Sequence, residues 1–311
     1  MPGDYLGREL IVVRTHFYNH SLDLFVQELE TRSGRKVVIA ADETNGPVAV
    51  PPSVSKVTVS AATAGLPAPP DAMWRCGDYN LYAVAAAHPD TQRFWLVEPD
   101  VRIHDEALDR FFDGTAATAA ADFVTPWFVQ ASPEWMWFDT MRPFSSRIHN
   151  CMLQAARFSR QAIAALEERR REMAEGFGEG KRPLTDWPND EAFVGATLVE
   201  AGMAVATFAE HAPDHRLDGS FTFLKPTSLN WLRRQPADRR LYHPVVEGDK
   251  FIKRANLFLD EVRVGHGGEA ALAREFDETF LEQIRAEGGD GAMERFGIKL
   301  RNAALAARRA G

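Results

Sequence analysis

Two carboxylates stand directly after a short apolar run. Residues 94–97 (FWLV) are followed at once by Glu98, Pro99 and Asp100. Ligands of an open parallel sheet bind outside the carboxyl ends of its strands, so acids placed there are candidates for function. Two carboxylates on a turn stiffened by proline can face one hard cation, and Mg²⁺ or Mn²⁺ prefers oxygen ligands and the diphosphate of a nucleotide. A strand that simply ends in an acidic turn is the alternative.

A second acidic pair, Asp190 and Glu191, stands at the start of a predicted helix over residues 191–201. Either carboxylate could serve as a general base for a hydroxyl group, a role that needs a pKa raised by partial burial. The dipole at a helix N-terminus favours the ionised form and opposes that rise. Asp190 as the N-cap, with Glu191 in the first turn, is therefore the structural alternative.

Other polar candidates are scattered along the chain. Thr15 and His16 follow the first predicted strand, and they could face a nucleotide or belong to an ordinary loop. His243 stands before a proline, where a structural loop residue is the more common interpretation. Basic residues surround His243, and Lys250 or Lys253 is preferred among them to bind a phosphate, with a solvated charged loop as the alternative.

Aromatic residues gather after a predicted strand at residues 121–126. Exposed rings beside an acidic site could stack on the C–H faces of a sugar, and rings that fill a core are the alternative. The members of this group are Trp127, Phe128, Trp135, Trp137 and Phe138.

The elements that must position these residues alternate between strand and helix. Residues 9–14 and 36–42 are apolar runs rich in β-branched side chains. Between them, residues 22–29 place apolar side chains at helical spacing, after Ser21 as a candidate N-cap. Strand, helix and strand within about 35 residues form a βαβ unit, which leads to a parallel sheet covered on both faces.

The same alternation continues along the chain. Further strands are predicted at residues 56–59, 94–97, 121–126 and 204–208, and further helices at residues 79–87, 151–173 and 191–201. Beyond residue 250 the pattern is helical. We therefore expect an α/β fold with a mainly parallel nucleotide-binding sheet flanked by helices over residues 1–255, and a helical C-terminal extension, residues 256–311, packed on it.

Composition excludes several classes of protein. The 311 residues carry 36 Lys and Arg against 44 Asp and Glu, and the formal charge of −8 excludes a uniformly basic nucleic-acid binder. Two cysteines, Cys76 and Cys151, cannot form a disulfide framework and are expected to be buried thiols. No Gly-x-Ser-x-Gly motif supports acyl transfer.

No apolar run reaches the length of a membrane span and the start of the chain lacks a signal-like pattern, so a cytoplasmic protein is expected. The basic segment after residue 297 supports at most a weak peripheral contact with anionic lipid at the inner face of a membrane.

Three stretches, in this order and spacing, resemble motifs of GT-A type glycosyltransferases, in particular poorly characterised bacterial members. Residues 75–101, from Arg75 through the predicted strand to Asp100, resemble the approach to the Asp-x-Asp motif of these enzymes. Residues 187–193 (WPNDEAF) are similar to the acidic motif that opens their acceptor-side helix, and residues 242–245 (YHPV) to their C-terminal His element. The resemblance covers residues 8–255.

The resemblance implies a role for each matching residue. Asp100 would be the metal ligand of the Asp-x-Asp motif, and His243 would complete metal or diphosphate binding. Asp78 matches an acidic position that contacts the nucleotide, and Asp190 or its neighbour Glu191 would be the general base.

Glu98 departs from the pattern of that motif. It stands in place of the first aspartate, is one methylene longer, and is followed by a proline that removes a backbone N–H. Its carboxylate would therefore contact either the nucleotide ribose or a water of the metal shell.

The implied protein is a metal-assisted glycosyltransferase with Mn²⁺ or Mg²⁺ as its cofactor. It would transfer a sugar from a nucleotide diphosphate donor to a hydroxyl of a glycan or lipid-linked acceptor. A nucleotidyltransferase on a similar sheet and a catalytically silent nucleotide- or sugar-binding protein are the alternatives. The absence of glycine from residues 15–20 disfavours the nucleotidyltransferase, whereas glutamate at position 98 keeps the silent protein open.

Overall fold

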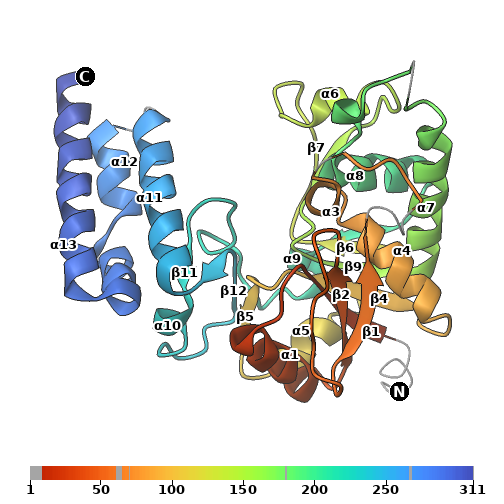
Figure 1. Ribbon diagram of the computed structural model, residues 1–311, viewed down its shortest axis with the longest axis horizontal. Helices are drawn as coiled ribbons and strands as arrows, with labels where there is room; N and C mark the ends of the chain where they lie inside the picture. The colour runs from red at the N-terminus through yellow and green to blue at the C-terminus, as the bar shows by residue number, and fades with distance from the viewer. Residues whose placement is uncertain (1–8, 61–64, 70, 179–180, 266–267, 311) are drawn as a thin grey trace. The chain divides into compact units, whose positions relative to one another are not determined.

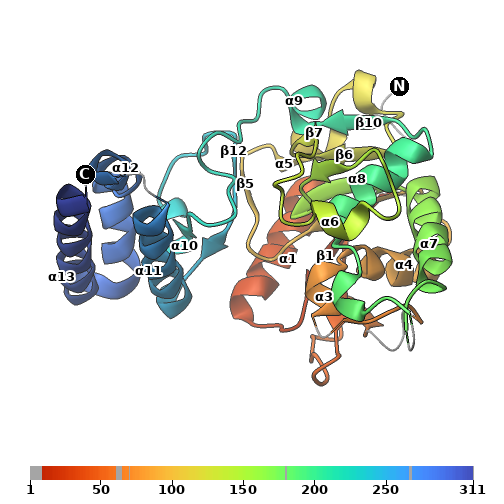
Figure 2. The ribbon, with the colours of Figure 1, turned by 90° about the horizontal axis from the view of Figure 1, so that it is seen from above.

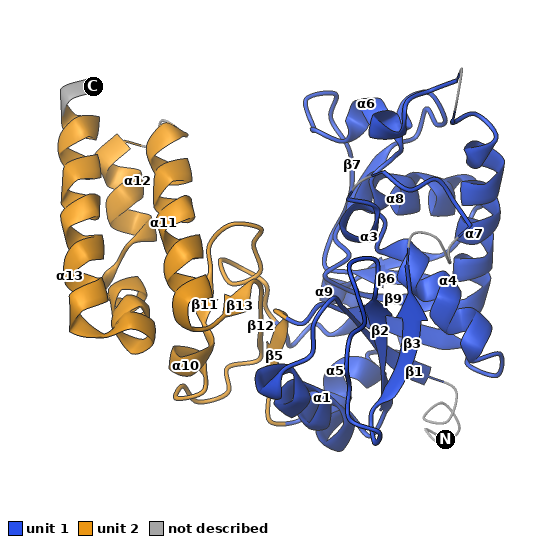
Figure 3. Ribbon diagram, in the orientation of Figure 1, with its two compact units in different colours: residues 1–99, 107–215 blue, residues 100–106, 216–311 orange. Residues whose placement is uncertain are grey.

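The computed structural model describes residues 9–60, 65–69, 71–178, 181–265 and 268–310. These residues belong to two compact units (Figure 3). Unit 1 comprises residues 1–99 and 107–215, and unit 2 comprises residues 100–106 and 216–311.

A seven-stranded sheet forms the centre of unit 1, in the order β10-β6-β9-β4-β1-β2-β3. Strand β9 runs antiparallel to its neighbours β4 and β6, and the other paired strands are parallel. The fold of unit 1 is therefore α/β with a mainly parallel sheet, as expected from the sequence. The strands are β1 (Glu9–Thr15), β2 (Lys36–Asp42), β3 (Ser55–Val59), β4 (Arg93–Val97), β6 (Phe123–Thr125), β9 (Ala155–Ser159) and β10 (Val205–Thr207).

Alternate side chains of each strand enter the cores on the two faces of this sheet. In β4, Phe94 and Leu96 join the core that includes residues of α4 and α7, whereas Trp95 packs against Phe111 and Phe112 of α5. Both faces are apolar because helices cover both, which explains why the strands read as nearly continuous apolar runs.

Helices cover the two faces in two groups (Figures 1 and 2). Helices α1 (His20–Ser33) and α5 (Leu108–Asp113) lie on one face, and α4 (Asp78–Ala87), α7 (Arg160–Ala174) and α8 (Asp190–Glu200) on the other. The predicted helix after the first strand is confirmed, but its N-cap is Asn19 and not Ser21, because the Asn19 side chain accepts the N–H of Leu22.

The long helix predicted over residues 151–173 is wrong in its first third. Residues 149–151 form strand β8 (His149–Cys151), and residues 155–159 form the antiparallel strand β9. The helix begins only at Arg160, where Ser159 caps it by accepting the N–H of Ala162. Pairing with strands on both sides overrides the helical spacing of the apolar residues in this segment.

Shorter elements complete unit 1. These are α3 (Ala72–Arg75), the 3₁₀ turns η2 (Ala116–Thr118) and η3 (Leu184–Asp186), β7 (Phe128–Gln130), α6 (Phe138–Met141) and α9 (Phe208–His211). Strands β7 and β8 pair with each other in a separate ribbon.

Unit 2 combines small strand pairs with helices. Strand β5 (Arg102–His104) pairs antiparallel with β12 (Arg240–Tyr242), and β11 (Thr227–Ser228) pairs parallel with β13 (Val245–Val246). The helices are α10 (Leu229–Leu232), α11 (Gly248–Val264), α12 (Gly268–Glu275) and α13 (Glu278–Ala310), the last interrupted at Gly289. Phenylalanines from α11 and α13, with Phe276 between α12 and α13, form their common core.

The boundary between the compact units differs from the division expected after residue 255. Residues 216–255 belong with the C-terminal helices because α13 binds them directly: Gln283 accepts the N–H of Ser228, and Glu287 accepts the N–H groups of Asn230 and Gly248. Among the described residues, no helix is both long enough and apolar enough to cross a membrane.

Candidate functional site

The strand order of unit 1 reverses between β1 and β4. The chain runs outward from β1 through β2 to β3, then returns to place β4 on the other side of β1. Ligands of open α/β sheets bind where the order reverses in this way. Arg14 lies at the end of β1 and Glu98 directly follows β4, and the Arg14 guanidinium donates to the Glu98 carboxylate.

Asp190 belongs to the same group of side chains. It lies in the first turn of α8, and its Oδ2 accepts the backbone N–H of Gly77 at 2.7 Å. The Nη1 atom of Arg14 lies 3.8 Å from that oxygen and donates to the carbonyl oxygen of Trp74 at 3.5 Å. Arg14 thus joins the end of the sheet, the start of α8 and the segment before α4.

Gly77 has no side chain because there is no room for one. A Cβ atom at this position would lie 2.2 Å from Nη1 of Arg14 and 2.7 Å from Oδ2 of Asp190. These distances are far below van der Waals contact, so the backbone approaches the two charged groups only as glycine.

The charges of this group are partly compensated. Burial raises the pKa of Asp190 from 3.8 to about 8, with Glu191 adding to the rise and Arg14 and the Gly77 N–H opposing it. Burial alone would lower the pKa of Arg14, but Glu98, Asp190 and Glu191 more than offset this, so its pKa is raised and the guanidinium stays charged. At neutral pH the group therefore holds the Arg14 cation beside a largely protonated Asp190.

Asn189, and not Asp190, is the N-cap of α8, since its side chain accepts the N–H of Glu191. Glu191 itself is buried, and its Oε1 accepts from Nε2 of Gln154 at 3.1 Å. Both predicted base candidates therefore lie in the first helical turn, and Asp190 is the one beside Arg14 and Gly77.

Asp78 does not take the nucleotide-facing position expected of it. It is 0% exposed, and its two oxygens accept from Nε and Nη2 of Arg170 at 2.8 and 3.1 Å. Arg170 is also fully buried and its guanidinium lies 3.8 Å from the ring centre of Phe193. This carboxylate neutralises a core arginine, so the sequence-based assignment is corrected to a structural one.

Thr15 and His16 occupy the turn after β1. The Thr15 hydroxyl donates to the carbonyl oxygen of Phe17 at 2.8 Å, so it closes the turn and its side chain is buried. His16 is exposed, with its ring centre 5.2 Å from that of Phe17. Of the two predicted nucleotide contacts, His16 presents its ring to solvent.

Unit 2 brings together Asp100 and His243. Nε2 of His243 lies 3.6 Å from Oδ1 of Asp100, and Nη2 of Arg254 lies 3.6 Å from Oδ2. The other ring nitrogen of His243, Nδ1, is 2.6 Å from the carbonyl oxygen of Thr222, which can only accept. In the neutral ring the proton is therefore on Nδ1, and the lone pair of Nε2 is directed to the side of the ring where Asp100 lies.

This arrangement fits a divalent cation. A histidine that donates one ring N–H to a backbone carbonyl and presents the other nitrogen beside a carboxylate has the second-shell support common to metal ligands. An imidazole nitrogen beside an oxygen ligand suits Mn²⁺ better than Mg²⁺, which prefers oxygen alone. His243 is buried and its backbone N–H donates to Ser220, so its position is fixed.

Lys250 is exposed in the first turn of α11, one turn before Arg254. The predicted phosphate contact at Lys250 is therefore on a helix that also carries a guanidinium at Asp100. Four of the five predicted aromatic residues, Phe128, Trp135, Trp137 and Phe138, are partly buried and pack against the core of unit 1.

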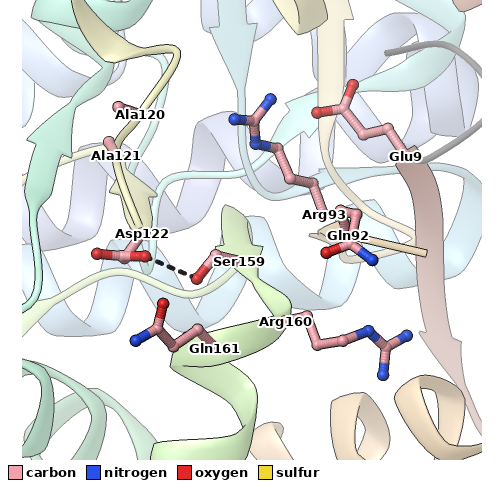
Figure 4. A pocket seen from close by; sticks show the side chains of 9 residues that line it. All are labelled: Glu9, Gln92, Arg93, Ala120, Ala121, Asp122, Ser159, Arg160 and Gln161. Atoms are coloured by element: carbon pink, nitrogen blue, oxygen red, sulfur yellow. Dashed lines mark hydrogen bonds between the residues drawn. The ribbon is translucent and has the colours of Figure 1, made fainter. Parts of the chain in front are cut away.

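A separate pocket of about 310 Å³ lies at the amino ends of β1 and β4, away from the carboxyl edge (Figure 4). Its polar groups serve the protein itself. Ser159 donates to Asp122, Glu9 accepts from Arg35, and the guanidinium of Arg160 donates to three backbone carbonyls at the end of α4 and after it.

Sequence reasoning missed Arg14, Arg254 and Gly77. Arg14 could have been found, because it stands at the end of the apolar run 9–14, as Glu98 stands directly after the run 94–97. The nearness of Gly77 to Arg14 and Asp190 depends on tertiary contacts between segments more than 60 residues apart in the chain, as the bond between Gly77 and Asp190 shows with its separation of 113 residues, and no local pattern signals it.

Comparisons with known proteins found no family for this chain, but they found a remote similarity to a solved structure. No protein-family model matches the chain, and no curated protein matches it. Among solved structures it is similar to a glycosyltransferase involved in the glycosylation of the major capsid of PBCV-1, with 12% sequence identity and a TM-score of 0.40 over 80% of this chain and 98% of that one. The class of fold rests on the strand order: an α/β protein with a mainly parallel sheet, helices on both faces and a helical C-terminal part.

Proposed function

We propose that the protein is a glycosyltransferase that moves a sugar from a nucleotide diphosphate sugar to a hydroxyl of a glycan or lipid-linked acceptor. The observation that carries this proposal is the group of Arg14, Glu98 and Asp190 at the reversal point of the sheet. A buried carboxylate with a pKa of about 8 is a stronger base than an ordinary aspartate once it is ionised, which happens as the pH rises through that value.

In this mechanism Asp190 is the general base. It takes the proton of the acceptor hydroxyl while the hydroxyl oxygen bonds to the anomeric carbon and the bond from that carbon to the diphosphate breaks. A single displacement of this kind inverts the configuration. Arg14 holds Asp190 in place and compensates its negative charge once it ionises, and Glu98 holds Arg14.

Asp100 and His243 would hold Mn²⁺ or Mg²⁺, which when bound neutralises charge on the departing diphosphate. Thr222 orients the His243 ring through Nδ1 for this role. Lys250 and Arg254 supply further positive charge on α11 for the same phosphates. Glu98 stands two residues before Asp100 in the chain, and its bond to Arg14 favours a positioning role over direct metal binding. Thr15 and His16 remain candidates to face the nucleotide, His16 through its exposed ring.

The test is calorimetric titration of nucleotides and nucleotide sugars, with and without Mn²⁺, on the wild type, Asp100→Ala and Asp190→Ala. We expect metal-dependent binding by the wild type, loss of the metal dependence in Asp100→Ala, and binding without transfer in Asp190→Ala. If the wild type binds no nucleotide sugar with or without Mn²⁺, the proposal is wrong. Binding with no turnover across a broad set of acceptors would instead support a silent binding protein.

A further inference from the structure

An exposed tryptophan belongs to the short segment whose backbone contacts Arg14 and Asp190. Trp74, in α3, is 65% exposed. Its ring centre lies 6.5 Å from that of Trp137, at an interplanar angle of 62°. Single exposed apolar residues are ordinary on protein surfaces, but an exposed indole set against a second indole is a larger aromatic surface than most.

The second indole, that of Trp137, packs against the guanidinium of Arg75. The guanidinium carbon of Arg75 lies 5.2 Å from the ring centre of Trp137. Arg75 is itself buried, and its Nη2 donates to the carbonyl oxygen of Trp187 at 2.8 Å. Trp137 therefore packs on a buried arginine and on the core of unit 1, and it is the aromatic neighbour of Trp74.

Backbone contacts connect Trp74 to the proposed base. The carbonyl oxygen of Trp74 accepts from Nη1 of Arg14, and the same Arg14 atom lies 3.8 Å from Oδ2 of Asp190. Three residues after Trp74, the N–H of Gly77 donates to that same oxygen. One short segment thus presents an aromatic face to solvent and fixes the carboxylate.

The position of the base identifies which substrate this surface meets. A general base must lie within hydrogen-bonding distance of the hydroxyl it deprotonates, so the acceptor lies at Asp190. Pyranose rings have apolar C–H faces that pack on indole, while their hydroxyls stay in water. We propose that Trp74, supported by Trp137, is the surface on which a pyranose ring of the acceptor stacks, an inference that rests on the proposed function.

The first experiment tests saccharide binding without catalysis. Saturation-transfer NMR with a panel of methyl pyranosides, among them methyl glucosides, galactosides and mannosides, is run on the wild type, Trp74→Ala, Trp74→Phe and Leu24→Ala. Leu24 is an exposed apolar residue of α1, 40% exposed, and serves as the matched control. We expect a signal from at least one glycoside with the wild type and Leu24→Ala, a weaker one with Trp74→Phe, and its loss with Trp74→Ala. An unchanged signal in Trp74→Ala, or no signal from any glycoside with the wild type, would overturn the inference.

The second experiment separates this inference from the proposed function. Hydrolysis of nucleotide sugars without acceptor reports on the donor, and transfer to the glycoside that binds reports on both substrates. Trp74→Ala should keep donor hydrolysis and raise the KM for the acceptor about tenfold. An acceptor KM equal to that of the wild type would refute the role of Trp74 and leave the transferase standing. If the wild type shows neither donor hydrolysis nor transfer, the transferase is refuted. The NMR result then decides on saccharide binding alone.

Discussion

Arg14 is the residue on which the site of unit 1 depends. It is the cation shared by Glu98 and Asp190, and it also donates to the Trp74 carbonyl. Its guanidinium donates to the Glu98 carboxylate. Burial disfavours the ionised form of Asp190 and raises its pKa to about 8, and the neighbouring Glu191 adds to the rise. A base of this kind takes up a proton readily once a hydroxyl is placed beside it.

The pH dependence of transfer should report this carboxylate. Because the base acts only when ionised, we expect kcat/KM of the wild type to rise with pH and level off above about 8. Asp190→Asn keeps the shape of the side chain and the acceptor for the Gly77 N–H but cannot take a proton. Its rate should fall about 10²- to 10⁴-fold and lose the rise with pH. A variant that retains the wild-type profile would assign the proton transfer to another group.

The raised pKa of Asp190 should also make the stability of the folded protein depend on pH. Its pKa is 3.8 when exposed and about 8 in the folded protein, so between these values the folded state holds a proton that the unfolded state has lost. This contribution is therefore fully present below the lower value and is lost as pH rises through the higher one. Urea unfolding at about pH 5 and about pH 9 should show Asp190→Asn gaining stability relative to the wild type at the higher pH. An equal difference at both pH values would contradict the shifted pKa.

At the scale of elements, the strands that build the site were predictable. The apolar runs at residues 9–14, 36–42 and 94–97 match β1, β2 and β4 to within a residue, and the helix after Asn189 begins one residue before the predicted start. Such runs are long and apolar because helices cover both faces of the sheet, so the local pattern and the tertiary structure agree.

The elements that failed are those fixed by distant partners. The segment at residues 155–159 is rich in alanine and favours no strand by itself, yet it pairs with β4 and β6. The resemblance implied a nucleotide contact for Asp78, and no local pattern indicated its ion pair with Arg170, which lies 92 residues away in the chain. Trp74 and Gly77 belong to a short segment around α3 that carries no periodic pattern. Local sequence cannot report contacts of this length.

Gly77 gives a prediction about this short segment. An alanine there would place its Cβ within 2.2 Å of Arg14 Nη1, so Arg14 and Asp190 must move apart. We expect Gly77→Ala to lose most of its transfer activity and about 1–3 kcal/mol of stability, the usual cost of overpacking. Gly176→Ala is the control, because its nearest new contact is an ordinary 3.4 Å from the Met173 carbonyl oxygen. Activity and melting temperature are measured on both variants. If Gly77→Ala and Gly176→Ala changed them alike, the close approach at Gly77 would not be the cause.

The buried ion pair between Asp78 of α4 and Arg170 of α7 gives a further prediction. Removing one member of a fully buried pair leaves an uncompensated charge and costs about 3–5 kcal/mol. Asp78→Ala should therefore unfold at much lower urea, and the double variant Asp78→Ala, Arg170→Met should recover part of the loss. If Asp78→Ala instead kept its stability and lost nucleotide affinity, the sequence-based assignment of Asp78 to the nucleotide would be restored.

At the scale of the whole molecule, the net charge of −8 does not show that acidic residues are compensated differently in the two units. In unit 1 the carboxylates gather around Arg14, which compensates them from within the protein. In unit 2, Asp100 faces a histidine nitrogen and the guanidinium of Arg254. The chain passes from one unit to the other between Pro99 and Asp100, so Glu98 and Asp100, two residues apart in the sequence, belong to separate units. An external cation is therefore expected to act on unit 2.

Unit 2 is itself assembled from two distant stretches of chain, residues 100–106 and 216–311, and the proposed metal ligands come one from each. A cation bound by Asp100 and His243 would join these stretches and stabilise the folded protein by mass action, by about 2.7 kcal/mol at a hundredfold excess over Kd. We expect Mn²⁺ to raise the melting temperature of the wild type and EDTA to reverse the shift. Asp100→Asn and His243→Ala should not respond.

The matched control is His104→Ala, which removes a histidine 3.1 Å from Asp238 in the same unit and should leave the Mn²⁺ shift intact. Glu98→Gln should also keep the shift, because the Glu98 carboxylate is bonded to Arg14. A shift that survives in both Asp100→Asn and His243→Ala would place the metal elsewhere, and its loss in Glu98→Gln would make Glu98 a ligand after all.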